Sequence, residues 1–136
     1  MIGSGDNLRH PIYIKDMLSA FLLAMESESA VGETIIIGGY QTMTTNEIIE
    51  SFCRVMNFSY PKKKLPLYLG KIIASSLEIA FGFAGKEPPV SKRSLEFFQT
   101  NNSFNINKGK RLLGFQPSFS FEEGLKESKP WLERNG

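Results

Sequence analysis

Apolar positions change period twice in the first forty residues, and each change predicts a new element. Residues 12–15 alternate in the two-residue period of a half-buried strand. Asp16 follows at a helix N-cap position, and residues 17–25 carry apolar side chains at helical spacing. The β-branched run 34–37 then ends at two glycines. Strand, helix and strand within about thirty residues predict a parallel βαβ unit with a right-handed crossover.

The remainder of the chain predicts several helices separated by turns. Thr44 and Glu47 have the spacing of a capping box, and Ser120 with Glu123 repeats it, so a helix is expected after each pair. Pro130 lies inside the second of these helices and is expected to end or kink it. The other expected elements are an apolar helix from Pro66 to Gly82–Gly85, a short helix over 91–99, a small strand over 103–106, and a helix over 108–113 capped by Asn107 and ended by Gly114.

Composition fits one soluble globular domain and narrows the classes of partner. The chain has 136 residues, of which 41% are hydrophobic and 22% charged. Sixteen basic against 14 acidic residues leave a net charge of +2, which is too balanced for a nucleic-acid-binding protein. The basic run 62–64 lies between two prolines and is interpreted as a solvated loop.

The chain contains one cysteine and one histidine, which limits its capacity for disulfide formation and for metal binding. Cys53 has no partner for an intramolecular disulfide, which favours a reducing, cytoplasmic compartment. His10 is the only histidine, so no metal site is expected. The longest apolar stretch, 65–84, contains two charged residues, which favours a core-packing helix over a membrane span.

Two motifs have spacings found in nicotinamide-dependent enzymes, but the residues around them do not predict the strand or helix that each motif requires. Gly3-Ser4-Gly5 lacks both a preceding strand and a third glycine at Leu8, so it is interpreted as a turn. Tyr60 and Lys64 have the Tyr-x-x-x-Lys spacing of a catalytic pair. Pro66 follows two residues later, where it would disrupt the helix that the pair requires.

Three segments, in order, resemble a known family. They read RHPIYIKD at 9–16, GETIIIGG at 32–39, and FNINKGKRLLGFQP followed by SFEEGLKES and a tryptophan within 104–131. Together they resemble the C-terminal half of an extended short-chain dehydrogenase/reductase of the NAD-dependent epimerase/dehydratase group. The resemblance covers nearly the whole chain.

The resemblance implies a fold, and it assigns substrate binding and cofactor binding to different parts of the enzyme. It implies that residues 1–136 form a single α/β (α+β) substrate-binding domain, a small parallel βαβ unit plus several helices. It also implies that an N-terminal Rossmann half, absent from this sequence, binds NAD or NADP and supplies the acid/base tyrosine. This chain is therefore expected to orient substrate for hydride transfer, to hold no catalytic residue, and to be inactive alone.

The same resemblance implies substrate contacts from five residues. Arg9 matches an arginine that contacts the nucleotide diphosphate in sugar-nucleotide members, and a guanidinium fork suits phosphate oxygens. A surface arginine paired with an acid is the alternative. The other expected substrate-binding residues are His10, Tyr13, Arg93 and Phe97. The alternative roles are local hydrogen bonding for His10 and packing for Tyr13.

Substrate class and assembly remain open at this point. No Gly-Asp follows Arg93, unlike in many sugar-nucleotide epimerases, and this region is more similar to that of relatives acting on hydroxysteroids, flavonoid ketones or other small carbonyls. The rival function is a stand-alone binding or scaffold domain without chemistry. An apolar face that the Rossmann half would cover is expected to drive self-association as a two-fold homodimer.

Overall fold

The computed structural model describes residues 3–61, 65–83, 85, 87, 88, 95 and 100–135. They divide into two compact units that alternate along the chain. Unit 1 joins Met1–Asn7 to Pro61–Asn101, and unit 2 joins Leu8–Tyr60 to Asn102–Gly136. Segment 9–16, which the sequence singled out, belongs to unit 2.

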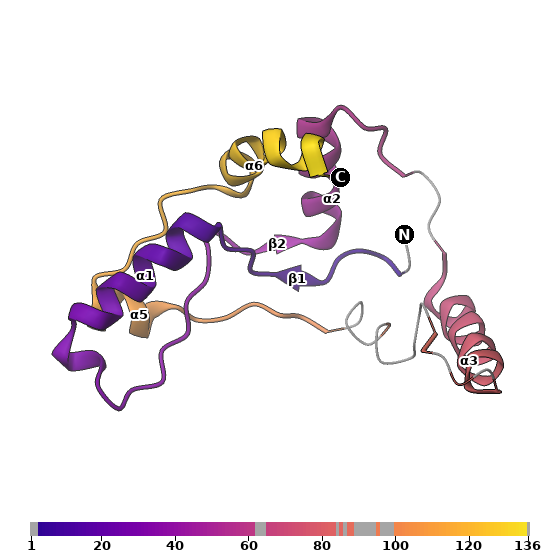
Figure 1. Ribbon diagram of the computed structural model, residues 1–136, viewed down its shortest axis with the longest axis horizontal. Coiled ribbons are helices and arrows are strands. Elements are labelled where there is room, and N and C mark those ends of the chain that lie inside the picture. The colour runs from indigo at the N-terminus through magenta and orange to yellow at the C-terminus, as the bar shows by residue number, and fades with distance from the viewer. Residues whose placement is uncertain are drawn as a thin grey trace. The chain divides into compact units, whose positions relative to one another are not determined.

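Both units are mainly helical, which confirms the mixed fold class with a small sheet. Unit 1 contains α3 (Leu67–Phe83), which starts directly after Pro66 as expected. Unit 2 contains, in chain order, β1 (Leu8–Arg9), α1 (Ile14–Glu26), the 3-10 turn η1 (Glu28–Ala30), β2 (Met43–Thr44), α2 (Thr45–Met56), α5 (Asn107–Leu113) and α6 (Phe121–Asn135) (Figure 1).

The predicted parallel βαβ unit is wrong in its strands. The two strands are β1 and β2, which pair antiparallel with Arg9 opposite Met43. Neither 12–14 nor 34–37 is a strand. The two segments still meet, since a Cβ on Gly39 would lie 1.9 Å from the Pro11 carbonyl oxygen. Pro11 has no N–H to donate to a ladder, and the hydrogen bond at this approach comes from the side chain of His10 to the Gly39 carbonyl oxygen (3.1 Å).

Asp16 does not cap α1, contrary to the sequence prediction. The helix begins two residues earlier, at Ile14, with Tyr13 in the cap position. Asp16 is buried, and its carboxylate accepts hydrogen bonds from the backbone N–H groups of Ser118 (2.9 Å) and Phe119 (3.1 Å). A distant loop thus uses the carboxylate that the local pattern assigned to the helix end.

The core of unit 2 lies between α1, α5 and the extended segment 34–37. Its buried centre is Ala20, Leu113 and Phe115, with Phe115 fully buried. Partly buried apolar side chains surround it, from Ile12, Leu23, Ala24, Ala30, Ile35 and Ile37. Segment 34–37 therefore contributes alternate residues to the core, as a strand would.

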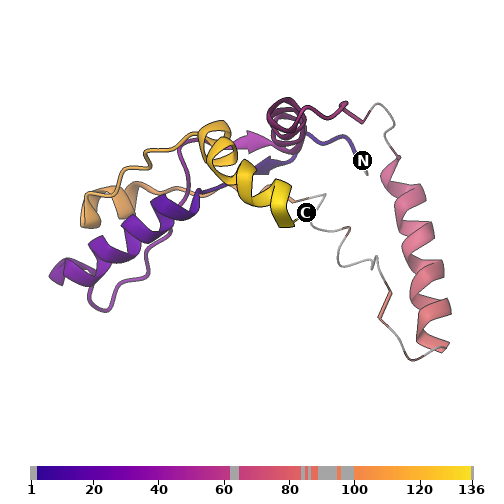
Figure 2. The ribbon, with the colours of Figure 1, turned by 45° about the horizontal axis from the view of Figure 1, so that its top comes forward.

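Helices α2 and α6 pack against each other in unit 2 (Figure 2). Both predicted capping boxes are present, at Thr44–Glu47 and at Ser120–Glu123. Lys129 donates to the Val55 carbonyl across the helix pair (2.9 Å).

Other local predictions need correction. Segment 103–106 is not a strand, and the preceding residue, Asn102, forms a parallel bridge with Arg9. Asn107 is the first residue of α5, and its N–H donates to the side chain of Asn105 (2.9 Å). Helix α6 continues through Pro130 to Asn135. The helix expected over 91–99 lies outside the described residues except Leu95.

Within the part of the chain that the structure describes, no helix combines the length and apolar character required to cross a bilayer.

Candidate functional site

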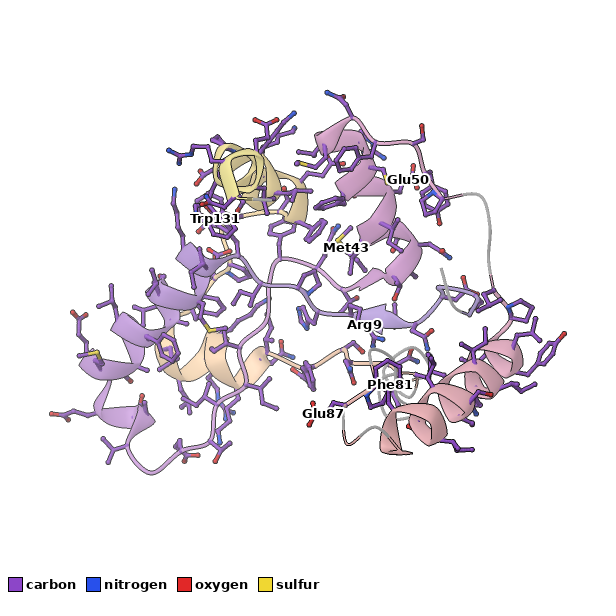
Figure 3. The ribbon with its side chains drawn as sticks, turned by 45° about the vertical axis from the view of Figure 1, so that its right-hand side comes forward. Arg9, Met43, Glu50, Phe81, Glu87 and Trp131 are labelled. Carbon is purple, nitrogen blue, oxygen red and sulfur yellow. The ribbon has the colours of Figure 1, made fainter. Side chains whose placement is uncertain are left out.

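Arg9 is held in the middle of the small sheet. It pairs with Met43 on one side and bridges to Asn102 on the other (Figure 3). Its side chain is buried at 8% exposure, and Nη1 donates to the Leu8 carbonyl (3.3 Å). A guanidinium stays charged even when buried, so this position carries a fixed positive charge.

His10 uses both ring nitrogens on backbone groups. Nε2 lies 3.1 Å from the carbonyl oxygen of Gly39, and the N–H of Phe104 lies 3.4 Å from Nδ1. Because a carbonyl can only accept and an N–H can only donate, these contacts specify the neutral ring with its proton on Nε2. Gly38 lies directly against the ring, where a Cβ would be 2.6 Å from Cε1. His10 therefore joins three chain segments.

Tyr13 lies on one wall of a small hollow. The hollow measures about 150 Å³ and is lined by Pro11, Ile12, Tyr13, Phe119, Ser120, Phe121, Gly124, Leu125 and Ser128. The Tyr13 and Phe119 rings are 4.9 Å apart and tilted by 58°, a favourable aromatic arrangement. A Cβ on Gly124 would lie only 2.7 Å from the Tyr13 ring, so glycine is what lets α6 approach it.

A carboxylate holds the hydroxyl end of Tyr13. The phenol donates to Glu127 Oε2 (3.0 Å), and Lys15 forms an ion pair with the same oxygen. Lys15 Nζ also lies 5.5 Å from the Phe119 ring centroid, within cation–π range.

These contacts shift the pKa values of Glu127 and Tyr13 in opposite directions. Hydrogen bonds from Lys15 and then Tyr13 lower the pKa of Glu127. Partial burial, followed by the hydrogen bond to Glu127, raises the pKa of Tyr13 above its ordinary value of 10.0. A tyrosine acid/base catalyst needs its pKa lowered towards neutrality. Tyr13 is thus arranged for packing and hydrogen bonding, and its phenol is not activated.

Three of the five expected site residues lie on one continuous segment of the chain. Arg9, His10 and Tyr13 follow one another along the segment that leads into α1. Arg93 and Phe97 lie outside the described residues. Tyr60 and Lys64, which the sequence analysis rejected as a catalytic pair, gain no support from the structure. Tyr60 lies outside any helix, and its hydroxyl donates to the side chain of Asn46 (3.1 Å). Lys64 lies outside the described residues.

Two features of this site escaped the sequence reasoning. The carboxylate of Asp16 accepts a hydrogen bond from the backbone N–H of Phe119, and the carboxylate of Glu127 accepts one from the hydroxyl of Tyr13. Both contacts span more than a hundred residues. The capping box at Ser120 is the sequence signal that could have indicated the role of Glu127. It fixes where α6 starts, and therefore which side of that helix carries Gly124 and Glu127.

The described residues do not fit a nicotinamide dinucleotide. Such a cofactor normally rests its pyrophosphate on a glycine turn that opens a helix. Gly3 and Gly5 have positive φ angles of 83° and 82°, but the next element along the chain is β1. Among the same residues, no group of three or more potential ligands is placed to hold a metal ion.

Comparison with known proteins relates the chain to larger enzymes. No family model matches it. It is 26% identical to sterol-4-alpha-carboxylate 3-dehydrogenase (decarboxylating) of Schizosaccharomyces pombe, covering 97% of this chain and 41% of that protein. It is 24% identical to dTDP-glucose 4,6-dehydratase of Escherichia coli, covering 98% and 31%. Uncharacterized protein y4nL of Sinorhizobium fredii is 28% identical, covering 100% and 39%.

Solved structures agree on the fold. UDP-glucuronic acid 4-epimerase from Bacillus cereus, crystallised with NAD, superposes with a TM-score of 0.66 at 20% identity over 98% of this chain and 34% of that one. UDP-glucose 4-epimerase from Thermotoga maritima gives a TM-score of 0.65 at 24% identity, with coverages of 98% and 34%. The solved structures are matched over their C-terminal portion.

These matches confirm the resemblance to NAD-dependent epimerase/dehydratase proteins, the extended short-chain dehydrogenases/reductases. The chain spans between about a third and two fifths of the length of the relatives named above.

Proposed function

We propose that this chain is the substrate-binding portion of an NAD(P)-dependent oxidoreductase of the epimerase/dehydratase type. The nicotinamide carries the hydride chemistry when bound, and we assign it to a Rossmann half outside residues 1–136. The observation that carries the proposal is the match of nearly the whole chain to the C-terminal portion of such enzymes.

The work assigned to this chain is binding and orientation. Arg9 supplies a positive charge whose position is fixed on two sides by backbone pairing. His10 holds the following turn, and Tyr13 forms a wall of an adjoining hollow. Fixed groups of this kind align a bound substrate without losing side-chain entropy at the moment of reaction.

The substrate is proposed to be a nucleotide sugar or a small carbonyl or alcohol compound such as a hydroxysteroid. Relatives support both classes, since one is a dTDP-glucose dehydratase and another a sterol dehydrogenase. A nucleotide diphosphate would use the charge of Arg9, whereas a steroid would depend on apolar surface and be indifferent to that charge.

The test is ligand binding by the purified chain and by an Arg9→Lys variant. Isothermal titration with dTDP-glucose, UDP-glucose and a hydroxysteroid is expected to show binding of one class. If it is the nucleotide class, Arg9→Lys should weaken affinity at least about tenfold, because a lysine cannot form the bidentate fork. Circular dichroism provides the control, since a variant that has lost its helices says nothing about binding.

Two results would contradict the proposal. No binding of any of the three ligands, by the chain alone or with a nicotinamide-binding half supplied, would favour a scaffold role. Nucleotide binding that is unchanged in a folded Arg9→Lys variant would make Arg9 a structural residue of the sheet.

A further inference from the structure

The hollow beside Tyr13, which we call the Tyr13 hollow, has walls that are packed into unit 2. Eight of its nine lining residues are partly buried, and the ninth, Gly124, is buried. Three of the nine are aromatic: Tyr13, Phe119 and Phe121. Small-molecule sites in proteins are concave and lined mainly by apolar and aromatic side chains in this way.

Two walls of the Tyr13 hollow are held by contacts of their own. The Tyr13 ring lies 4.9 Å from the Phe119 ring, and its hydroxyl donates to Glu127 (3.0 Å). The N–H of Phe119 donates to the buried carboxylate of Asp16 (3.1 Å). A Cβ on Gly124 would lie 2.7 Å from the Tyr13 ring, so the backbone of α6 supports that ring directly. Because the walls are already ordered, a ligand that enters the hollow does not have to immobilise them.

The volume of the Tyr13 hollow limits its occupant to one ring. The hollow measures about 150 Å³, which is the space that about five water molecules occupy in the liquid. An apolar protein cavity of about this volume binds benzene. A system of four fused rings, as in a steroid, exceeds this space.

The hydroxyl groups along the Tyr13 hollow have no hydrogen left to donate to a ligand. Ser120 donates to the carboxylate of Glu123 (2.6 Å). Ser128 donates to the carbonyl of Gly124 (2.9 Å), and the Tyr13 hydroxyl is engaged as described above. Since each hydroxyl carries a single donor hydrogen, an anionic ligand would lose its hydration without gaining a hydroxyl donor in return. A neutral apolar ligand pays no such cost.

We propose that the Tyr13 hollow binds a single neutral aromatic ring of a small molecule. Aromatic rings attract one another in tilted or offset arrangements, and the 58° tilt between Tyr13 and Phe119 presents both a ring face and a ring edge to an occupant. The inference goes beyond the proposed function, because such a ligand carries no phosphate and requires neither the charge of Arg9 nor a nicotinamide.

The experiment titrates toluene into the full 136-residue chain, at concentrations below its limit of solubility in water. Carbon–proton NMR spectra of the aromatic residues are expected to show saturable shifts of Tyr13 and Phe119. Ser128→Leu should weaken binding at least about tenfold, because the longer apolar side chain occupies part of the hollow. Ser128→Ala leaves the hollow open and should bind toluene as the unaltered chain does.

The matched control is Ser76→Leu on α3. Its hydroxyl also donates to the carbonyl four residues earlier, that of Ile72 (3.0 Å), so the substitution removes the same kind of hydrogen bond away from the Tyr13 hollow. It should leave toluene binding unchanged. Circular dichroism checks that every variant keeps its helices, and Leu125→Trp, at another lining position, replaces Ser128→Leu if that variant does not fold.

Three results would overturn the inference: no saturable shift of Tyr13 and Phe119, undiminished binding by a folded variant that fills the hollow, or equal loss in Ser128→Ala and Ser128→Leu. The third result would assign binding to the hydroxyl and not to the space. Because toluene has neither charge nor phosphate, failure of this test leaves the proposed function untouched, and failure of the proposed function leaves this test unchanged.

Discussion

Single residues with small or buried side chains set the geometry around Tyr13. Gly124 lets α6 approach the ring, and Asp16 fixes the neighbouring loop through two backbone N–H groups. Glu127 accepts a hydrogen bond from the Tyr13 phenol and forms an ion pair with Lys15. Each role depends on a property of one residue, so each can be tested by a conservative substitution.

Gly124→Ala is expected to lower the free energy of unfolding by about 1–3 kcal/mol, because the new methyl group would overlap the Tyr13 ring. Helix propensity alone would favour alanine by about 1 kcal/mol, so the sign of the change identifies the contact. Urea denaturation followed by circular dichroism measures it. Gly82→Ala in α3, where no atom lies within 4 Å of the new methyl group, should instead be neutral or stabilising.

Glu127 is expected to make stability depend on pH in the acid range. Its pKa in the folded state lies below its ordinary value of 4.5, so folding favours the ionised form. This contribution is present above about pH 4.5 and is lost as pH falls through the folded-state pKa. The difference in urea midpoint between the unaltered chain and Glu127→Gln should therefore shrink between about pH 6.5 and about pH 3.

The control for Glu127 is Glu28→Gln, which removes a carboxylate that has no ion pair among the described residues. Its difference from the unaltered chain should stay small at both pH values. An equal pH response in the two variants would refute the assigned role of Glu127.

At the scale of elements, capping boxes fix where two of the helices start. Thr44 accepts from the N–H of Glu47 (3.2 Å), while the Glu47 carboxylate accepts from the N–H of Thr44 (2.6 Å). The latter bond is the main reason that the pKa of Glu47 is lowered. Ser120 and Glu123 make the same contacts at the start of α6. Because α2 packs on α6, the two boxes together set the register of the pair.

Thr44→Ala is expected to lower the free energy of unfolding by about 1 kcal/mol, since the N–H of Glu47 loses its acceptor. Thr44→Ser keeps that acceptor and should retain most of the stability. Urea titrations of the three proteins measure the difference. A Thr44→Ser variant as unstable as Thr44→Ala would attribute the loss to the threonine methyl group and not to the cap.

At the scale of the whole molecule, the chain is small beside the enzymes it resembles. It covers 31–41% of the three named relatives, and its described residues lack the glycine turn and helix that hold a dinucleotide. We therefore expect this chain alone to bind substrate but not to carry out hydride transfer.

The chain alone is expected to show no binding of NADH or NADPH, as measured by quenching and energy transfer from Trp131 fluorescence. It should likewise show no change in nicotinamide absorbance with dTDP-glucose, UDP-glucose or a hydroxysteroid. Adding a nicotinamide-binding half from a related enzyme is the positive arm. Turnover by residues 1–136 unaided would show that this division is wrong.

Several local signals gave correct predictions, although the caps assigned to Asp16 and Asn107 were wrong. Both capping boxes, the glycine that ends α5, and the helix after Pro66 all follow from contacts within one or two turns. The order of the motifs along the chain was also sufficient to indicate the family resemblance. Motifs such as 9–16 and 32–39 can be identified from sequence even though their structure depends on distant residues.

Long-range partners settled the rest. Segment 34–37 has the composition of a strand, but the backbone pairing in this unit is between β1 and β2, and 34–37 packs on the core through Ile35 and Ile37. Asp16 has the composition of a cap, but two amides a hundred residues away bind its carboxylate. The hydrophobic period and the two capping boxes thus specified helices from the sequence alone. The tertiary structure decided the strand pairing, the partners of the buried charges and the Tyr13 hollow, because folding brings together groups that no local pattern relates.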